Sequence, residues 1–362
     1  MLGLFNKSKA VFPLIFVILV SFSVPSEAAR KKKRPKKPKF WQMVTFNAQL
    51  EIRYDDNVIN YSDDELDLYA GGENESRFPI DSEDDWIFIP RIEARIKGNL
   101  FGGHTAWLEP FFRYDYYSRN DIRRFYKIGL NGRHYLFPSG YVEAEYSIIP
   151  DYYYRNQYYE EESGTGTYRE ANFLKHYLKL EYGMNLLPSL KGDVSYRYEH
   201  KTFNEEFSER DLSENGLRLD GIWRAMDWIK FWVFYGLERA EAKGADIPDL
   251  DVKDVSYDAW EILFGVRYYA DFLKKYKPEF VTTLKYRRIK YQTLKYVDDY
   301  RFGRKDSNYY FRIGMAGRLP AKVGIELDYN LVGKRVTLLD TSKEGQLEFD
   351  SNSISLTLNR NF

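Results

Sequence analysis

Apolar and polar residues alternate along much of this chain. The segment 44–54 places Val, Phe, Ala, Leu, Ile and Tyr on one face, and Thr, Asn, Gln, Glu and Arg on the other. The segment 86–97 alternates in the same way and carries four charged residues on its polar face. Because successive side chains of a β-strand point to opposite sides, such segments are predicted to be strands with one apolar and one wet face.

The same pattern recurs to the end of the chain and predicts fourteen strands. We place them at 44–54, 86–97, 104–117, 122–135, 140–154, 172–185, 191–203, 213–225, 228–240, 256–270, 278–291, 307–318, 321–333 and 346–362. An even number of strands is typical of single-chain bacterial barrels.

The links between these strands alternate in length. Every second link is short. The first strand begins and the last strand ends on the same side of the barrel as these short links. The other links are longer and more polar, at 56–84, 155–170, 204–212, 241–255, 292–306 and 334–345, except for a short one at 118–121. Short periplasmic turns and long extracellular loops are typical of outer-membrane proteins. We therefore expect an all-β fold, a transmembrane antiparallel up-and-down barrel of about 14 strands.

The first residues predict a cleaved leader. Lys7 and Lys9 precede an apolar stretch at 10–24, and Ser26 and Ala28 occupy the small-residue positions before a signal-peptidase cut. No other stretch offers the roughly eighteen apolar residues of a membrane-spanning helix, so membrane residence is expected through the barrel. We expect a signal peptide at 1–29, a basic disordered periplasmic arm at 30–39 and the barrel at 40–362.

Composition and charge agree with this division. Aromatic residues are 18% of the chain and charged residues 30%, which suits strands with a lipid face, a wet face and aromatic girdles. The formal net charge is 0, but residues 1–29 carry +1 and RKKKRPKKPK at 30–39 carries +8, which leaves −9 for 40–362. The basic arm is expected to be a solvated spacer, with anionic headgroups or an acidic periplasmic protein as alternative contacts.

The chain ends in an amphipathic strand, SISLTLNRNF, with Leu356 and Leu358 on its apolar face and Phe362 as the last residue. This ending resembles the C-terminal assembly signal of outer-membrane proteins, which the barrel-assembly machinery recognises. The resemblance implies insertion into the outer membrane of a Gram-negative bacterium, in contact with its lipid and lipopolysaccharide.

The segment EIRYDDNVINYSDDE at 51–65 resembles the opening of a family of β-barrel porins often found beside envelope-polysaccharide genes. The resemblance implies a channel or accessory barrel for surface polymers, with envelope-polysaccharide machinery as a partner. Asp55, Asp56, Asp63 and Asp64 within it could hold Ca²⁺, which prefers clustered carboxylate oxygens. Their spacing is not that of an EF-hand, and a solvated acidic loop is the favoured interpretation.

Residues for catalysis are few. The chain has four His and no Cys. By strand register we place His104 and His134 near periplasmic turns, His176 toward lipid in mid-strand and His200 near an extracellular mouth, so we expect no cluster. Nucleophilic catalysis and transition-metal binding then lose their usual residues. We expect no enzymatic activity, no cofactor, no metal and no nucleic-acid partner.

Inward positions carry interleaved charges of both signs. On the second and third strands these are Arg91, Glu93, Arg95, Glu109, Arg113 and Asp115. They either form cross-strand ion pairs that tile a wet wall, or make a constriction whose field orders polar solutes. We favour ion pairs for most of them. Trp107, Phe111, Trp232 and Phe234 also point inward, either to stack on sugars or to fill space.

Fourteen strands enclose a narrower lumen than that of a sixteen-stranded porin. We expect a channel for small polar solutes or ions, accessory to the export of an envelope polysaccharide. The alternative is a non-conducting structural or surface-interaction barrel with a plugged lumen.

Overall fold

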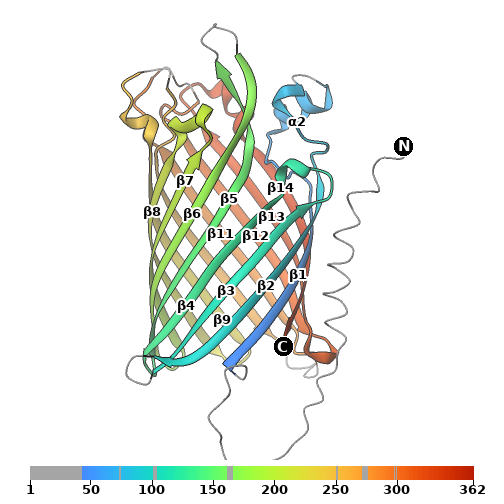
Figure 1. Cartoon of the computed structure of the whole chain (residues 1–362), viewed down its shortest axis with the longest axis vertical. Helices are drawn as coiled ribbons and strands as arrows, with labels where there is room; N and C mark the ends of the chain where they lie inside the picture. Colours follow the sequence, from blue (N-terminus) through green and yellow to red (C-terminus); the bar gives the residue numbers. More distant parts are fainter. Residues whose placement is uncertain are drawn as a thin grey trace, which may run out of the picture.

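The computed structural model describes residues 43–72, 75–100, 104–160, 166–249, 252–270, 276–296, 298 and 300–362. The predicted leader and basic arm lie outside these residues. Fourteen strands close into one barrel, in which every strand pairs antiparallel with its sequence neighbours (Figure 1). The first strand, β1 (Val44–Asp55), closes the barrel by pairing with the last, β14 (Phe349–Asn361). The predicted fold, an all-β antiparallel barrel of fourteen strands, is confirmed.

The remaining strands follow in chain order. They are β2 (Asp85–Leu100), β3 (His104–Tyr117), β4 (Phe125–Phe137), β5 (Gly140–Glu160), β6 (Gly166–Leu187), β7 (Leu190–Phe203), β8 (Leu212–Met226), β9 (Ile229–Ala242), β10 (Tyr257–Tyr269), β11 (Glu279–Tyr291), β12 (Lys305–Arg318) and β13 (Gly324–Thr337). Twelve of the fourteen agree with the predicted bounds to within a few residues.

The exceptions are β5 and β6, whose 21 and 22 residues make a hairpin that rises above its neighbours (Figure 1). The segment 155–170, predicted as a loop, is mostly strand. A strand segment that does not contact lipid needs no apolar face, so its apolar and polar residues do not alternate. The pairing of β5 with β6 is irregular between Ile149 and Tyr152 and again between Tyr153 and Arg155. Such bulges redirect side chains.

The two faces of the wall differ as a membrane barrel requires. Large apolar side chains point outward and are exposed, among them Ile92 at 54%, Leu108 at 49% and Leu219 at 55%. Charged residues of the same strands point inward, where they are partly buried. An apolar surface that runs around the whole barrel is stable in lipid and not in water.

The links sort by length as predicted. Two-residue turns at 138–139, 188–189 and 227–228 lie at the end where β1 begins and β14 ends. The opposite end carries the long loops, of which 56–84 contains the helix α2 (Asp63–Ala70) and the 3-10 turn η3 (Glu75–Arg77). Loop 204–211 contains η6 (Glu205–Arg210). Among the described residues, no helix has the length and hydropathy to span a membrane.

The four carboxylates considered for Ca²⁺ have structural roles instead. Asp63 and Asp64 lie in the first turn of α2, where the helix dipole favours negative charge. Asp55 accepts a hydrogen bond from Ser351 Oγ at 3.0 Å, and Asp56 accepts from the Asn352 backbone at 2.6 Å, so both tie β1 to β14. Within the described ranges, no group of three or more His, Asp or Glu side chains is arranged to hold a metal ion.

Candidate functional site

The six charged residues predicted to line the lumen form three ion pairs on β2 and β3. The pairs join Arg91 to Glu93, Arg95 to Glu109 and Arg113 to Asp115, each with 2.6 Å between nitrogen and oxygen. The three arginines therefore do not make an isolated positive cluster, because each is matched by a carboxylate. A field from such pairs is short-ranged.

The same arrangement continues around the inner wall. Further pairs join Lys127 to Glu145, Arg133 to Glu143, Lys179 to Glu181, Arg218 to Asp220, Arg287 to Glu238 and Arg312 to Asp328. Residues on one face of neighbouring strands, or two apart on one strand, stand close enough for this pairing. The wall is thus wet but nearly neutral along these strands.

The inward aromatic rings are covered by cations. Arg91 lies 4.6 Å from the centre of the Phe111 ring, Arg95 lies 4.5 Å from that of Trp107, and Arg218 lies 3.5 Å from that of Phe234. A ring face that already carries a guanidinium is not open for stacking. Of the two interpretations of these aromatics, the geometry favours space filling.

The histidines are closer together than predicted. The rings of His104 and His134 lie 6.4 Å apart near the short turns. His176 and His200 are direct partners in the register of β6 and β7. His176 lies in the middle of β6, as predicted, and His200 lies near the loop end of β7. Their ring nitrogens are engaged separately, by Tyr146 for His176 and by Ser213 for His200.

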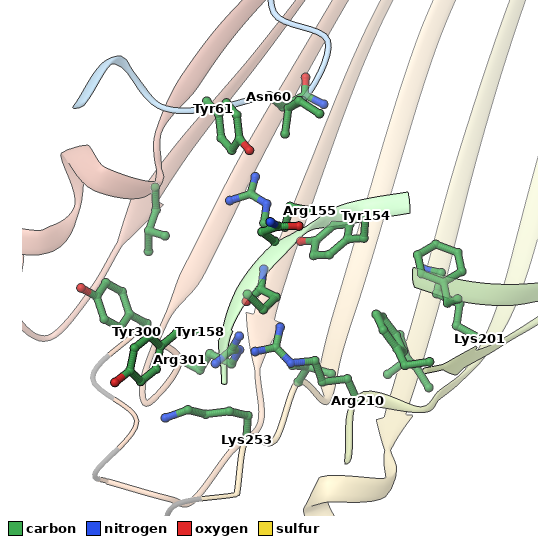
Figure 2. A pocket seen from close by; sticks show the side chains of 18 of the residues that line it. Asn60, Tyr61, Tyr154, Arg155, Tyr158, Lys201, Arg210, Lys253, Tyr300 and Arg301 are labelled. Carbon is green, nitrogen blue, oxygen red and sulfur yellow. The ribbon is translucent and has the colours of Figure 1, made fainter. Parts of the chain in front are cut away.

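A cavity of about 900 Å³ occupies the loop end of the lumen (Figure 2). We call it the outer cavity. It is lined by loop 56–84, the upper parts of β5 to β8, and the loops at 252–256, 292–304 and 338–348. Loop 56–84 lies over the mouth because its Val58, Ile59, Tyr61, Phe78 and Ile80 pack on the inner side of β2, β3 and β5. Access to the lumen is therefore narrowed from this side.

Cations dominate the outer cavity. Its lining contains Arg77, Arg155, Lys175, Lys201, Arg210, Lys253, Arg301, Arg304 and Lys334. Of the described residues in the same lining, two carry carboxylates, Glu65 and Asp298. The lining of the outer cavity is therefore positive, whereas the ion pairs of the wall below it balance each other. This local excess of positive charge occurs although residues 40–362 as a whole carry a net charge of −9.

The excess arises because three carboxylates each serve two cations. Glu65 pairs with Arg77 at 2.6 Å and with Arg155 at 3.5 Å. Glu199 is shared by two lysines, Lys175 and Lys201, and Asp306 by Arg304 and Lys334. One negative charge cannot neutralise two positive ones, so each sharing leaves net positive charge facing the cavity.

Arg210 is one of the buried cations of the lining. It is 7% exposed and has Glu209 at 3.3 Å. Burial and the positive charge of Arg301 lower the pKa of Arg210 to about 10, below the ordinary value for arginine. Arg210 therefore remains charged at neutral pH, at an energetic cost that an incoming anion would relieve.

Open tyrosine rings share the cavity with these cations. Tyr154 is 43% exposed, Tyr158 57% and Tyr300 42%. Figure 2 shows Tyr154 beside Arg155 on β5, and Tyr158 and Tyr300 in the same lining as Arg301. Arg155 lies 5.5 Å from the centre of the Tyr154 ring, Lys343 lies 5.2 Å from that of Tyr300, and the Tyr168 ring meets Tyr158 edge-on at 5.7 Å. The three tyrosines nevertheless remain exposed in the cavity, whereas Phe111 and Phe234 of the wall below are buried.

Comparison with known proteins adds only limited information. No family model and no curated protein matches the chain. Solved structures that match include a bacterial polysaccharide outer membrane secretin, with a TM-score of 0.44, 9% identity, and coverage of 87% of this chain and 98% of that one. A loop-deletion mutant of OmpT, an outer membrane protein of Vibrio cholerae, has a TM-score of 0.46, 10% identity, and coverage of 88% and 99%. The outer membrane channel DcaP of Acinetobacter baumannii has a TM-score of 0.43, 9% identity, and coverage of 88% of this chain and 96% of that one.

Likeness at these scores says nothing about the solute. The class of this protein follows instead from its own features: a closed antiparallel barrel, an apolar outer surface and a charged inner wall. These features are those of a transmembrane β-barrel of the outer-membrane type.

Proposed function

We propose that this protein is an outer-membrane channel for small polar solutes or ions. The observation that carries the proposal is the inner wall, where charges of both signs are paired with each other and remain partly exposed to water. In barrels of about eight strands side chains fill the interior, whereas fourteen strands enclose more space than paired side chains of the wall occupy. Paired charges keep a path wet without holding a passing ion strongly.

We further propose that the channel is accessory to the export of an envelope polysaccharide in a Gram-negative bacterium. The resemblance of segment 51–65 and the exposed tyrosines of the outer cavity support this role. Its partners would be outer-membrane lipid and lipopolysaccharide, the barrel-assembly machinery and the polysaccharide machinery. An enzymatic role finds no support in the residues brought together.

A specific observation favours the second candidate, a non-conducting barrel. Loop 56–84 packs inward over the mouth and is held there by Arg77 and Arg155 through Glu65. If this loop closed the path, the barrel would be plugged and its loops would serve surface contact.

Planar-bilayer conductance of the purified protein separates the two candidates. A channel gives unitary current steps in KCl, whereas a plugged barrel gives none. Replacing Glu65 with Gln removes the shared carboxylate that holds Arg77 and Arg155, so it should raise conductance or flickering if loop 56–84 narrows the path. If neither the wild type nor the Glu65→Gln variant gives current, the proposal of a channel is contradicted.

A further inference from the structure

We propose that the outer cavity is a binding site for an acidic oligosaccharide. The inference names the solute class of the channel proposed above and rests on it for its physiological meaning, although the site itself can be tested without any current. It combines two features of the cavity that the wall below lacks: unbalanced positive charge and exposed tyrosine side chains.

The charge selects an anion. Nine cations line the cavity, and among the described residues five carboxylates pair with them, including those of Glu199, Glu209 and Asp306 behind the lining. Cations inside a concave, partly dry site attract anions more strongly than they would on an open surface. Lys253 contributes further, because no carboxylate lies within 4 Å of it among the described residues.

The rings select a saccharide among anions. Tyr154, Tyr158 and Tyr300 are exposed in the lining, which they share with the cations of the cavity (Figure 2). Tyrosine offers an apolar face for the C–H side of a sugar ring and a hydroxyl for its polar groups. Several rings and several dispersed cations suit a chain of charged sugars better than they suit one compact phosphate.

Size and position agree with this occupant. A volume of about 900 Å³ lies toward the upper end of ligand sites, so it can hold several linked rings. Below it, a second hollow of about 250 Å³ shares Ile149 and Lys175 with the outer cavity and is lined by both signs, including Lys127, Glu145 and Glu199. An acidic chain would therefore meet its strongest attraction at the mouth and a balanced surface deeper in the lumen.

Calorimetric titration of the full-length barrel in detergent tests the site directly. The probes are oligogalacturonate, neutral maltohexaose, and inorganic polyphosphate of matched charge. We expect the wild type to bind oligogalacturonate at least tenfold more tightly than maltohexaose, with the affinity falling as salt rises from 0.1 to 1 M because exposed charges are screened. Arg210→Gln with Arg301→Gln should weaken oligogalacturonate binding about tenfold, and Lys253→Gln should weaken it severalfold.

Two comparisons control for fold and for nonspecific charge. Arg239→Gln removes a cation from the outer face of β9, where its side chain is 71% exposed and outside the lining, and should leave the affinity unchanged. Tyr154→Ala with Tyr158→Ala should weaken oligogalacturonate binding and leave polyphosphate binding unchanged. Lys253 has no ion-pair partner among the described residues, so its variant tests the site even if the arginine double variant does not fold.

The proposal is overturned if the folded wild type binds no oligogalacturonate, if it binds polyphosphate equally well, or if Lys253→Gln and the arginine pair both bind as the wild type does. Failure of the channel is a separate result. A barrel that binds oligogalacturonate without conducting keeps this site and loses the proposed function, whereas one that conducts without binding keeps the function and loses the site.

Discussion

Phe111 of β3 lies against Gly129 of β4, its partner in the strand register, so closely that a Cβ on Gly129 would stand 2.4 Å from the ring carbon Cζ. Trp232 of β9 covers Gly265 of β10 in the same way, with a Cβ there 2.1 Å from Cε2. Glycine in a strand often marks such a close approach, and an aromatic ring across from it restores the packing that the missing side chain would provide. The rings thus lie along the wall instead of across the lumen.

Gly129→Ala should therefore destabilise the barrel. The added methyl group would meet the Phe111 ring and, at 2.7 Å, the backbone carbonyl of Tyr146, which has little room to move. Overpacking of this kind costs about 1–3 kcal/mol in the free energy of unfolding. Urea titration of the protein folded in lipid measures the difference.

Gly221→Ala is the matched control. The nearest atom to its new methyl group would be Val233 Cγ1 at 3.6 Å, an ordinary contact. We expect a change within about 0.5 kcal/mol. Equal unfolding free energies for the Gly129 and Gly221 variants would show that the Phe111 ring moves aside at no cost.

The strands were predictable because lipid and lumen impose opposite requirements on successive residues. The segment 104–117 was predicted from alternation alone, and β3 has those bounds. The same reasoning failed at 155–170, where the β5 and β6 hairpin stands clear of both environments.

The outer cavity could not be predicted in this way. Arg210 and Arg301 come from separate loops, and Arg155 follows a bulge. The alternation of a regular strand therefore cannot predict whether their side chains point into the lumen. Their approach depends on how loop 56–84 and the other loops pack at the mouth.

Topology can be tested with epitope tags. Tags at Gly71 and Ala245, both exposed in long loops, should be reached by antibody on intact cells, whereas tags at the short turns beside Pro138 and Pro188 should not. Gly244 itself is a poor site, since it is buried and an added Cβ would stand 2.1 Å from the Lys253 carbonyl. The third tip considered from the sequence, at 164, lies outside the described residues. Labelling of the short turns alone would reverse the assignment of the two ends.

Assembly should depend on the end of β14. The Phe362 backbone N–H donates to the Phe46 carbonyl at 2.8 Å, and Leu356 pairs with Ile52 in the register that closes the barrel. Deleting Phe362, or replacing Leu356 or Leu358 with Asp, should block insertion, because a carboxylate on the lipid face is destabilising. Heat-modifiable protein in the outer-membrane fraction reports the outcome.

Leu356→Ile, which preserves the apolar face, serves as the control for this series and should assemble normally. Normal levels of folded protein for all three disruptive variants would remove the assembly role of this strand.

Binding of oligogalacturonate should be independent of pH between about pH 6 and pH 8. The cations that line the outer cavity are all Lys or Arg, and the lowered pKa of Arg210, about 10, lies above this range, so Arg210 keeps its charge. The carboxylates of the probe are ionised throughout, since groups of this type have pKa values of about 4. Calorimetry at both ends of the range gives the comparison, and a tenfold difference would require a titrating group that this account lacks.

Ion selectivity should follow the charges of the inner wall. Arg91→Gln with Arg95→Gln leaves the carboxylates of Glu93 and Glu109 without their paired cations, and Asn47 still donates to Glu93 at 2.8 Å and keeps it in place. The local field becomes more negative, so the reversal potential in a KCl gradient should shift toward cation selectivity.

The opposite replacement, Glu93→Gln with Glu109→Gln, should shift selectivity toward anions, and Arg239→Gln on the outer face should change nothing. Both shifts should be smaller at 1 M than at 0.1 M salt, because the Debye length falls from about 10 Å to about 3 Å. Folding should be retained, since the lipid face is untouched. If both lumen variants conduct with the wild-type selectivity, the paired charges have only a structural role in the wall. If neither the wild type nor any variant conducts at any salt or voltage, the plugged barrel replaces the channel.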